Sequence, residues 1–525
     1  MNSYITEEDV RLVVGRYFKR ENAILQTYSI QFASKNMLGF LCDYLSLRIW
    51  VMINGDELVM DCFVKCISKN AADMVKEMKL FDKECIFYTD IKEDIFVTGI
   101  KPWSPKLIAA FNESMVFENL ITRGYRMHNK LQTLDEAHTK QALSTLARFH
   151  ASTIIYEEKR SKELKRPYSI NEDYAQDLRR AGYKMTNTWF QQCMLGALNA
   201  VTHHSKYAES KDIIDACVQR WPDLWKAALD LSDFSSKYRN VICHRDLWNN
   251  NLLFHYVEGV PDDCLLVDFQ AARCHPPAGD IMMLLYCNLD PGLREGKLEE
   301  FLDHYHLELD SILQRFDVSV NSILTLEDLY RSAEEYRLWG LVTSACLIPQ
   351  TWMDDEVTTE IFTDAKNFDE ILSRDKAKFL SEMLLNDDNY KGKVLDRPVS
   401  ADVELRRSGR AARDASFSAP ASHVVAHQLH RVEIDKLQYR DETKAGDEAA
   451  PAPGDDGFTQ TTDNIGEIKT LTDQIEPLHD DILPITVGHF PRVFHVQHGC
   501  SGEVRASSGK GERLPISIFR DTSNF

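Results

Sequence analysis

Basic residues are scarce relative to acidic ones in this chain of 525 residues, with 61 lysines and arginines against 81 aspartates and glutamates. The formal net charge of −20 argues against nucleic acid or an anionic membrane surface as the main partner, because both are bound through basic surfaces. It does not exclude a nucleotide, since a few local cations and a magnesium ion can hold its phosphates.

Long apolar runs are also missing. The most apolar later stretch, 338–349, is too short to span a bilayer and is interrupted by Gly340, Thr343 and Ser344. The first residues, MNSYITEEDV, lack the charged and apolar regions of a signal peptide. We therefore expect a cytoplasmic protein without membrane insertion, and a monomer.

The sequence has no pattern of cysteines that would build a disulfide or zinc framework. The twelve cysteines are scattered. Cys62 and Cys66 have three residues between them, and no second pair stands at the spacing of a zinc site. The pattern favours reduced and mostly buried thiols.

Aromatic residues become rare after about residue 395. Between 396 and 489 they are Phe417, Tyr439 and Phe458 alone. Such a stretch cannot bury enough apolar surface to offset the entropy lost on ordering. We interpret 396–525 as a mostly disordered tail.

What is present before that point begins with strand patterns. The β-prone runs 45–53 and 58–67 are separated by Asn54-Gly55, the strongest short hairpin signal. A helix is expected over 71–88, followed by strands at 106–111 and 114–117. From 134 onward helical patterns dominate, opened by Thr133 and Glu136 at the spacing of a capping box.

The main chemical signal lies in H-R-D-L-W-N-N-N, 244–251, and in L-L-V-D-F-Q, 265–270. Asp246 precedes Asn251 by five positions, and Asp268 follows an apolar run. Phosphoryl-transfer enzymes use this arrangement, with one aspartate to orient the attacking hydroxyl and an asparagine and a second aspartate to bind magnesium. We therefore predict Asp246 as the catalytic residue and Asn251 and Asp268 as ligands of Mg²⁺.

Such a site needs a lysine for the phosphates of ATP and a carboxylate to hold that lysine. Lys65 lies in F-V-K at the end of a strand pattern, and Glu84 lies in F-D-K-E-C-I-F-Y on the helix that follows. We predict that these two residues form the strand-to-helix ion pair.

Two further parts of a nucleotide site are less distinct. The segment that ends the fifth strand contains Phe117, Glu118 and Leu120, and we expect its backbone to pair with adenine. The loop that covers the phosphates offers only Gly39 in K-N-M-L-G-F-L, because a G-x-G-x-x-G pattern is absent.

The order of these patterns predicts an α+β, bilobal protein-kinase-like fold. A small antiparallel β-sheet lobe with one helix, 1–120, would bind the nucleotide. A large, mainly α-helical lobe, 121–395, would carry the catalytic loop and the acceptor pocket.

Together these motifs resemble the ecdysteroid kinase-like family of insects, in the choline kinase and aminoglycoside phosphotransferase group. The resemblance covers about 1–390, and Trp248 and Gln270 are specific to this branch. Two positions depart from it, since Arg245 and Cys42 stand where members commonly have glycine. The resemblance also implies that Asp280 braces the catalytic loop and that His150 is packed behind it.

What the resemblance implies is phosphorylation, with ATP and Mg²⁺, of a hydroxyl on a small lipophilic molecule such as an ecdysteroid or a hydroxylated xenobiotic. Two alternatives stay open: a choline- or aminoglycoside-like kinase with an acidic acceptor pocket, and an inactive pseudokinase that binds its ligand. The acceptor pocket is expected among the C-terminal helices, where apolar side chains are available at Tyr336, Leu338, Trp339, Leu347 and Trp352.

Overall fold

The computed structural model describes residues 4–399, except for gaps at 20–21, 36–37, 40, 70–71, 73–74, 77–78, 180–182, 365–366 and 368–369. The chain divides into two compact units, 1–442 and 443–525, and all described residues belong to the first. The tail predicted to be disordered lies outside the described residues, except that the last described helix reaches Val399.

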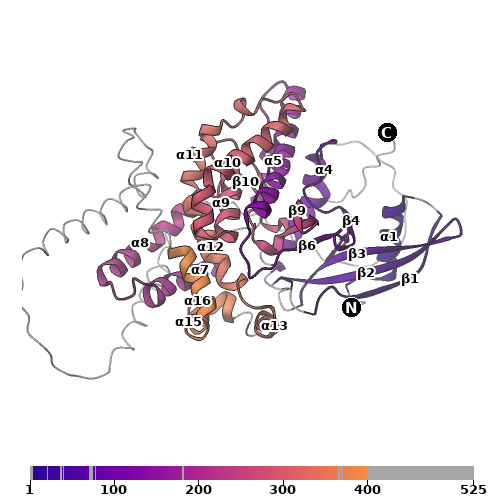
Figure 1. Ribbon diagram of the computed structural model, residues 1–525. Coiled ribbons are helices and arrows are strands. Elements are labelled where there is room, and N and C mark those ends of the chain that lie inside the picture. Colours follow the sequence, from indigo (N-terminus) through magenta and orange to yellow (C-terminus); the bar gives the residue numbers. More distant parts are fainter. Residues whose placement is uncertain are drawn as a thin grey trace, which may run out of the picture. The chain divides into compact units, whose positions relative to one another are not determined.

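The N-terminal part is a five-stranded antiparallel sheet in the order β1-β2-β3-β5-β4 (Figure 1). Its strands are β1 (Ala23–Phe32), β2 (Cys42–Ile53), β3 (Asp56–Ile67), β4 (Leu107–Ala110) and β5 (Ser114–Glu118). The β2–β3 turn forms at Asn54-Gly55, whose φ values of 54° and 94° are those a two-residue hairpin turn requires. The predicted hairpin is therefore confirmed.

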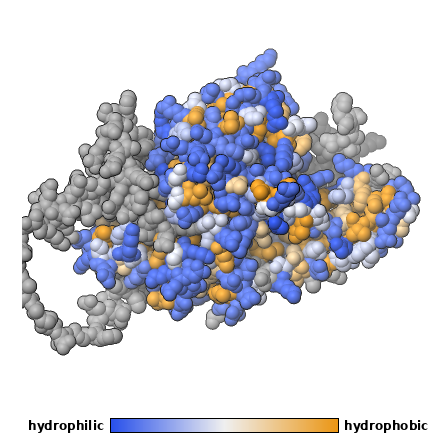
Figure 2. Space-filling view, in the orientation of Figure 1, coloured by the Kyte–Doolittle hydropathy of each residue, from blue (hydrophilic) through white to orange (hydrophobic). Residues whose placement is uncertain are grey.

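One helix in this part had no counterpart in the sequence analysis. Helix α1 (Glu7–Phe18) begins at a capping box between Thr6 and Asp9. Its Val10, Val13 and Val14 pack into the core that the sheet forms with residues such as Leu47. Farther along the sheet, Ile24, Leu58 and Val59 are exposed, and apolar residues gather on the sheet lobe in the space-filling view (Figure 2).

The helix expected over 71–88 is shorter where the structure describes it. Helix α3 (Leu80–Ile86) continues through a π-helical turn (Phe87–Ile91) into α4 (Lys92–Asp94). Phe87 of that turn stacks on Phe269 with ring centroids 4.3 Å apart. This contact fixes the helix that carries Glu84 against the segment that carries Asp268.

The C-terminal part is mainly helical (Figure 1). Helix α5 packs on α10 and helix α9 on α12. The helices are α5 (Glu136–Leu164), α6 (Asn171–Arg179), α7 (Thr188–Asn199), α8 (Lys211–Asp230), α9 (Pro277–Asn288), α10 (Pro291–Gln314), α11 (Leu326–Glu335), α12 (Arg337–Thr351), α13 (Asp355–Thr363), α15 (Lys376–Asn386) and α16 (Asp388–Val399). The predicted α+β, bilobal architecture is confirmed.

Short strands flank the segments that contain the predicted site residues. Strand β7 (Val241–Cys243) pairs with β10 (Arg273–His275), and β8 (Leu252–Val257) pairs with β6 (Tyr125–Met127) and β9 (Val260–Leu266). Asp246 and Asn251 therefore lie between β7 and β8, and Asp268 follows β9.

Helix α5 begins two residues later than the capping-box pattern at Thr133 predicted. Its N-cap is Asp135, whose carboxylate accepts the backbone N–H of His138 at 2.9 Å. An aspartate caps a helix as well as a threonine does, and Asp135 also accepts from the His138 ring at 2.7 Å. These two bonds explain why the later cap is the one that forms.

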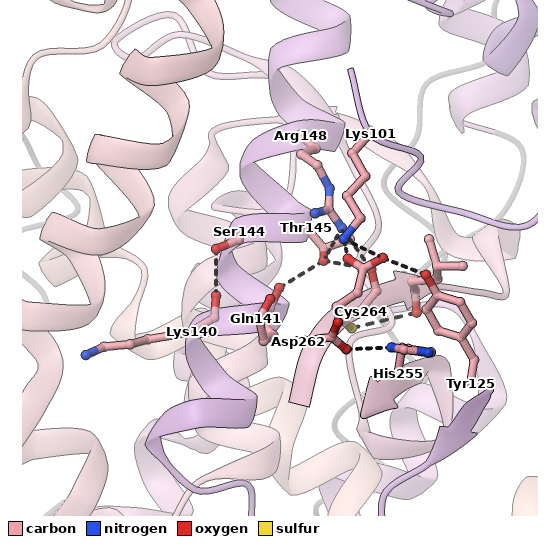
Figure 3. A network of polar contacts seen from close by, with 12 residues as sticks. Lys101, Tyr125, Lys140, Gln141, Ser144, Thr145, Arg148, His255, Asp262 and Cys264 are labelled. Carbon is pink, nitrogen blue, oxygen red and sulfur yellow. Dashed lines mark hydrogen bonds and ion pairs between the residues drawn. The ribbon is translucent and has the colours of Figure 1, made fainter. Parts of the chain in front are cut away.

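A buried polar network fixes α5 to the β8–β9 hairpin (Figure 3). Asp263 of β9 accepts from the Tyr125 hydroxyl at 2.6 Å and from Arg148 of α5 at 2.9 Å, and pairs with Lys101 at 3.0 Å. Burial raises the pKa of Asp263, but these three donors outweigh burial and lower it. The network positions the strand that leads to Asp268.

Replacing Asp263 with alanine should destabilise the protein by about 3 kcal/mol, because it leaves the buried Arg148 without its charge partner. The matched control is Asp262→Ala on the same strand, where an exposed carboxylate pairs with His255 and should contribute less than about 1 kcal/mol. Denaturant unfolding of the two variants measures the difference. Equal losses would contradict the role given to the network.

Candidate active site

A buried ammonium group joins three elements of the site. Lys65 Nζ, on β3, lies 2.6 Å from Glu84 Oε2 on α3 and 2.9 Å from Asp268 Oδ1 after β9. The Lys65 and Glu84 side chains are almost completely buried. The structure thus brings the predicted lysine and glutamate together and adds Asp268 to the pair.

The charges of this cluster do not balance, and their pKa values reflect it. Burial lowers the pKa of Lys65, but the charges of Asp268 and Glu84 outweigh burial and raise this pKa well above its usual value. Burial raises the pKa of Glu84 to about 7 although Lys65 opposes the change. The carboxylates therefore compete for a single cation.

Asp246 and Asn251 are in direct contact in the loop between β7 and β8. The Asn251 amide nitrogen donates to the Asp246 carboxylate at 3.0 Å and to the Asp246 backbone carbonyl at 2.7 Å. No hydrogen bond to the Asn251 side-chain oxygen is found among the described residues, and Asn251 lines the cavity described below. Burial, followed by the charge of Asp268, raises the pKa of Asp246 to about 7.

His244 fixes the backbone on which Asp246 stands. Its Nε2 lies 2.8 Å from the carbonyl of Val267, and its Nδ1 accepts the Asp246 N–H at 3.2 Å. These two contacts require the neutral ring with its proton on Nε2. Burial favours that form by lowering the pKa of His244.

Asp280 of α9 braces the same loop from behind, which agrees with its expected role. Its two carboxylate oxygens accept the backbone N–H groups of His244 at 2.6 Å and Arg245 at 2.9 Å. His150 lies 3.3 Å from Asp280 and 2.8 Å from the Tyr305 hydroxyl. Cys243 is close enough to complete a three-ligand metal cluster, but burial raises its thiol pKa, which favours a hydrogen-bonded brace.

A cavity adjoins these groups. Asp246, Asn251 and Asp268 line it together with Gly39 and Cys42. The rest of its wall is mainly apolar or uncharged: Leu38, Leu41, Tyr44, Leu80, Tyr183, Asn187, Trp189, Trp248, Gln270, Ala271, Leu347, Gln350 and Thr351. The predicted catalytic and metal-binding residues thus line the same cavity.

Several predicted residues lie elsewhere. Phe117 packs edge-on against Tyr88 at 4.9 Å, Leu120 is buried against Tyr125, and Glu118 pairs with Arg123 at 2.9 Å. None of the three is among the residues that line this cavity. Their pairing with adenine stays a prediction.

The predicted acceptor wall is only partly present. Of its five residues, Leu347 lines the cavity. Trp339 and Tyr336 are buried beside His275, at ring distances of 6.4 and 6.1 Å. The wall residues that sequence reasoning missed, such as Trp189 and Gln350, come from separate helices and carry no local motif.

Arg245 is an unusual neighbour of Asp246. It is fully buried at φ 65°, and no described residue hydrogen-bonds to its guanidinium. The group instead lies over the rings of Trp339 and Tyr183, at 5.1 and 5.7 Å. Burial, together with the nearby Arg273, lowers its pKa to about 10.

The family model of the ecdysteroid kinase-like family matches residues 46–318, which include Lys65, Glu84, Asp246, Asn251 and Asp268. The chain belongs to the ecdysteroid kinase-like family. This membership confirms the predicted resemblance and the predicted class, a small-molecule kinase. No curated protein matches the chain.

Solved structures similar to this family member are phosphotransferases and a kinase. The streptomycin–ATP complex of APH(2")-IIa is 12% identical and covers 65% of this chain and 93% of its own, with a TM-score of 0.31. The apoenzyme of macrolide 2'-phosphotransferase MphH from Brachybacterium faecium is 11% identical and covers 68% of this chain and 97% of its own, with a TM-score of 0.29. A microcompartment-associated aminopropanol kinase is 14% identical and covers 73% of this chain and 99% of its own, with a TM-score of 0.28.

Replacing Asp246 with asparagine should stabilise the protein at neutral and alkaline pH. The raised pKa means that the folded state holds a proton that the unfolded state has lost, so the carboxylate destabilises increasingly as pH rises towards 7. Between about pH 5 and about pH 8 the advantage of Asp246→Asn should grow by about 2 to 3 kcal/mol. Denaturant unfolding at the two pH values measures it, and a constant difference would contradict the raised pKa.

Proposed function

We propose that this protein transfers the γ-phosphoryl group of ATP, with Mg²⁺, to a hydroxyl of a small lipophilic molecule. The observation that carries the proposal is the arrangement of Lys65 between Glu84 and Asp268, with Asp246 and Asn251 on the same cavity. Phosphoryl transfer needs positioning and charge neutralisation, and these residue types supply both.

The donor set fits a magnesium ion. Lys65 provides one positive charge against the carboxylates of Glu84, Asp268 and Asp246, so the cleft has an excess of negative charge. Asp268 Oδ1 is buried, and its ion pair with Lys65 is the only contact found for this atom among the described residues. Asp268 and the Asn251 side-chain oxygen would hold the ion, which would neutralise charge on the phosphates.

Each remaining group has a part in the transfer. Lys65 would contact the phosphates of ATP while Glu84 keeps its ammonium in place. Asp246 would accept a hydrogen bond from the acceptor hydroxyl and take up its proton as the O–P bond forms. Gly39 and its neighbours in the loop before β2 would approach the phosphates through backbone N–H groups.

The cavity wall favours a lipophilic acceptor over a cationic one. Among the described residues that line it, the only carboxylates are Asp246 and Asp268. Both are required for the transfer itself, so no acidic group is left to recognise an amine. An ecdysteroid or a hydroxylated xenobiotic suits Trp189, Trp248 and Leu347 better than choline or an aminoglycoside does.

The pseudokinase alternative rests on the loop with one glycine. The position of Tyr44 also motivates this alternative, because its side chain crowds the loop: the Tyr44 hydroxyl lies only 2.8 Å from where a Cβ on Gly39 would stand. The intact set of residues around Lys65 favours an active enzyme instead.

Among the described residues, no helix has the length and apolarity to cross a membrane. The cytoplasmic location and the monomeric state stay predictions.

The test is phosphoryl transfer by the full chain from radiolabelled ATP to a panel of ecdysteroids and hydroxylated lipophilic compounds. Asp246→Asn and Asp268→Ala should each reduce the rate at least about 100-fold, because each removes a group that acts in the transfer. Asp262→Ala, on an exposed carboxylate outside the cavity, is the control and should keep the wild-type rate.

Two outcomes would contradict the proposal. Full activity in both variants would show that the site residues are wrong. Thermal stabilisation of the wild type by Mg-ATP, without transfer to any acceptor of the panel or to water, would favour the pseudokinase.

A further inference from the structure

A buried lysine lies behind one wall of the cavity. Lys376, the first residue of α15, is 2% exposed. Its ammonium lies 2.9 Å from Gln350 Oε1, 3.1 Å from Cys193 Sγ and 3.4 Å from the Cys346 carbonyl. Since α15, α12 and α7 all contribute to these contacts, the ammonium joins three helices at the cavity wall.

This lysine fixes the orientation of the Gln350 amide. An ammonium group can only donate hydrogen bonds, so the atom of Gln350 that faces it must be the oxygen. The amide nitrogen then points away from Lys376. No described residue accepts a hydrogen bond from it, and Gln350 lines the cavity.

The position of Lys376 is set by more than Gln350. Its ammonium lies 5.4 Å from the ring centroid of Trp189, another residue of the cavity wall. Cys193 Sγ also lies 3.8 Å from the Cys346 carbonyl. Burial raises the pKa of Cys193, but a hydrogen bond with the Cys346 side chain and the charge of Lys376 outweigh burial and lower that pKa to about 7. A cation held on several sides is a rigid support for the amide.

Two other polar groups of this wall are engaged within the protein. The Thr351 hydroxyl donates to the Leu347 carbonyl at 2.9 Å, and the Asn187 side-chain oxygen caps α7 at the Phe190 N–H. Gln270 also lines the cavity, but it follows Asp268 by two residues and so belongs to the phosphate end. Gln350 is thus a donor placed on the helical wall.

We propose that Gln350 is a specificity-determining residue that donates a hydrogen bond to an oxygen of the acceptor molecule, and that Lys376 is the residue that positions it. The subsite takes a neutral, lipophilic molecule with a carbonyl oxygen in addition to the hydroxyl that is phosphorylated. Calling this molecule the acceptor rests on the proposed function, whereas its binding does not.

The test compares two steroids that differ in one oxygen, by equilibrium dialysis with the full chain. Dihydrotestosterone carries a hydroxyl at one end and a ketone at the other, and its deoxy analogue has a methylene in place of the ketone. The wild type should bind the ketone about tenfold more tightly, the effect of one hydrogen bond to an otherwise unpaired donor.

Two variants of Gln350 should remove this preference. Gln350→Leu has no donor, and Gln350→Glu keeps the shape and the contact with Lys376 but has no N–H group. In both, the ratio of the two dissociation constants should fall to about one. Because Gln350→Glu conserves volume and pairs with Lys376, it provides the test if the leucine variant does not fold.

The control for the substitution is Gln191→Leu on α7, where the amide donates to the Met185 carbonyl at 2.9 Å and does not line the cavity. It should keep the tenfold ratio. Lys376→Met should lower the ratio to about threefold by freeing the amide to rotate. If Lys376 had a purely structural role, Lys376→Met would weaken the binding of both steroids alike and leave the ratio of their dissociation constants unchanged.

Three results would overturn the inference: binding of neither steroid, equal binding of both by the wild type, or an unchanged ratio in the Gln350 variants. Phosphoryl transfer is measured separately. Transfer to other acceptors with no steroid discrimination would remove the inference and leave the proposed function. Discrimination between the two steroids without phosphoryl transfer to any acceptor would leave the binding inference and remove the proposed function.

Discussion

The site depends on one buried ammonium group. Lys65 reaches Glu84 and Asp268, which come from a helix of the sheet lobe and from the segment after β9. Without this cation, the buried carboxylate of Glu84 would lie near the partly buried carboxylate of Asp268. An uncompensated buried charge costs several kcal/mol. The stacking of Phe87 on Phe269 holds the same two segments with apolar contact. Charge and packing therefore specify the same arrangement.

The same cluster is under-neutralised, and this links structure to chemistry. Glu84 and Asp246 both have pKa values raised to about 7, which means that their environment favours the proton over the bare charge. A site that only stabilised the fold would gain from more positive charge. The excess is understandable where a divalent cation and a nucleotide are to be bound, because each then replaces a proton or a weaker contact.

Local patterns carried most of the predictable information. Asn54-Gly55 specified a hairpin because few residue pairs tolerate two positive φ values, and the spacing of Asp246, Asn251 and Asp268 indicated segments that line one cavity. Helix α1 was missed because its apolar face, Val10, Val13 and Val14, is short and only the sheet makes it a helix face. The cavity wall was beyond reach, since Leu347 and Trp189 become neighbours only through helix packing.

Arg245 shows how one residue can belong to both the loop and the cavity. A left-handed backbone costs a side chain about 1 to 2 kcal/mol, and burial of the guanidinium adds to this cost. Asp280 offsets part of it by accepting the Arg245 N–H, and the rings of Trp339 and Tyr183 offset part through their faces. Tyr183 also lines the cavity. Glycine at 245 would relieve the backbone but remove one of the groups packed against Tyr183, which also contacts Trp189 and Trp339. The cation next to Asp246 therefore helps to hold Tyr183 in the cavity wall.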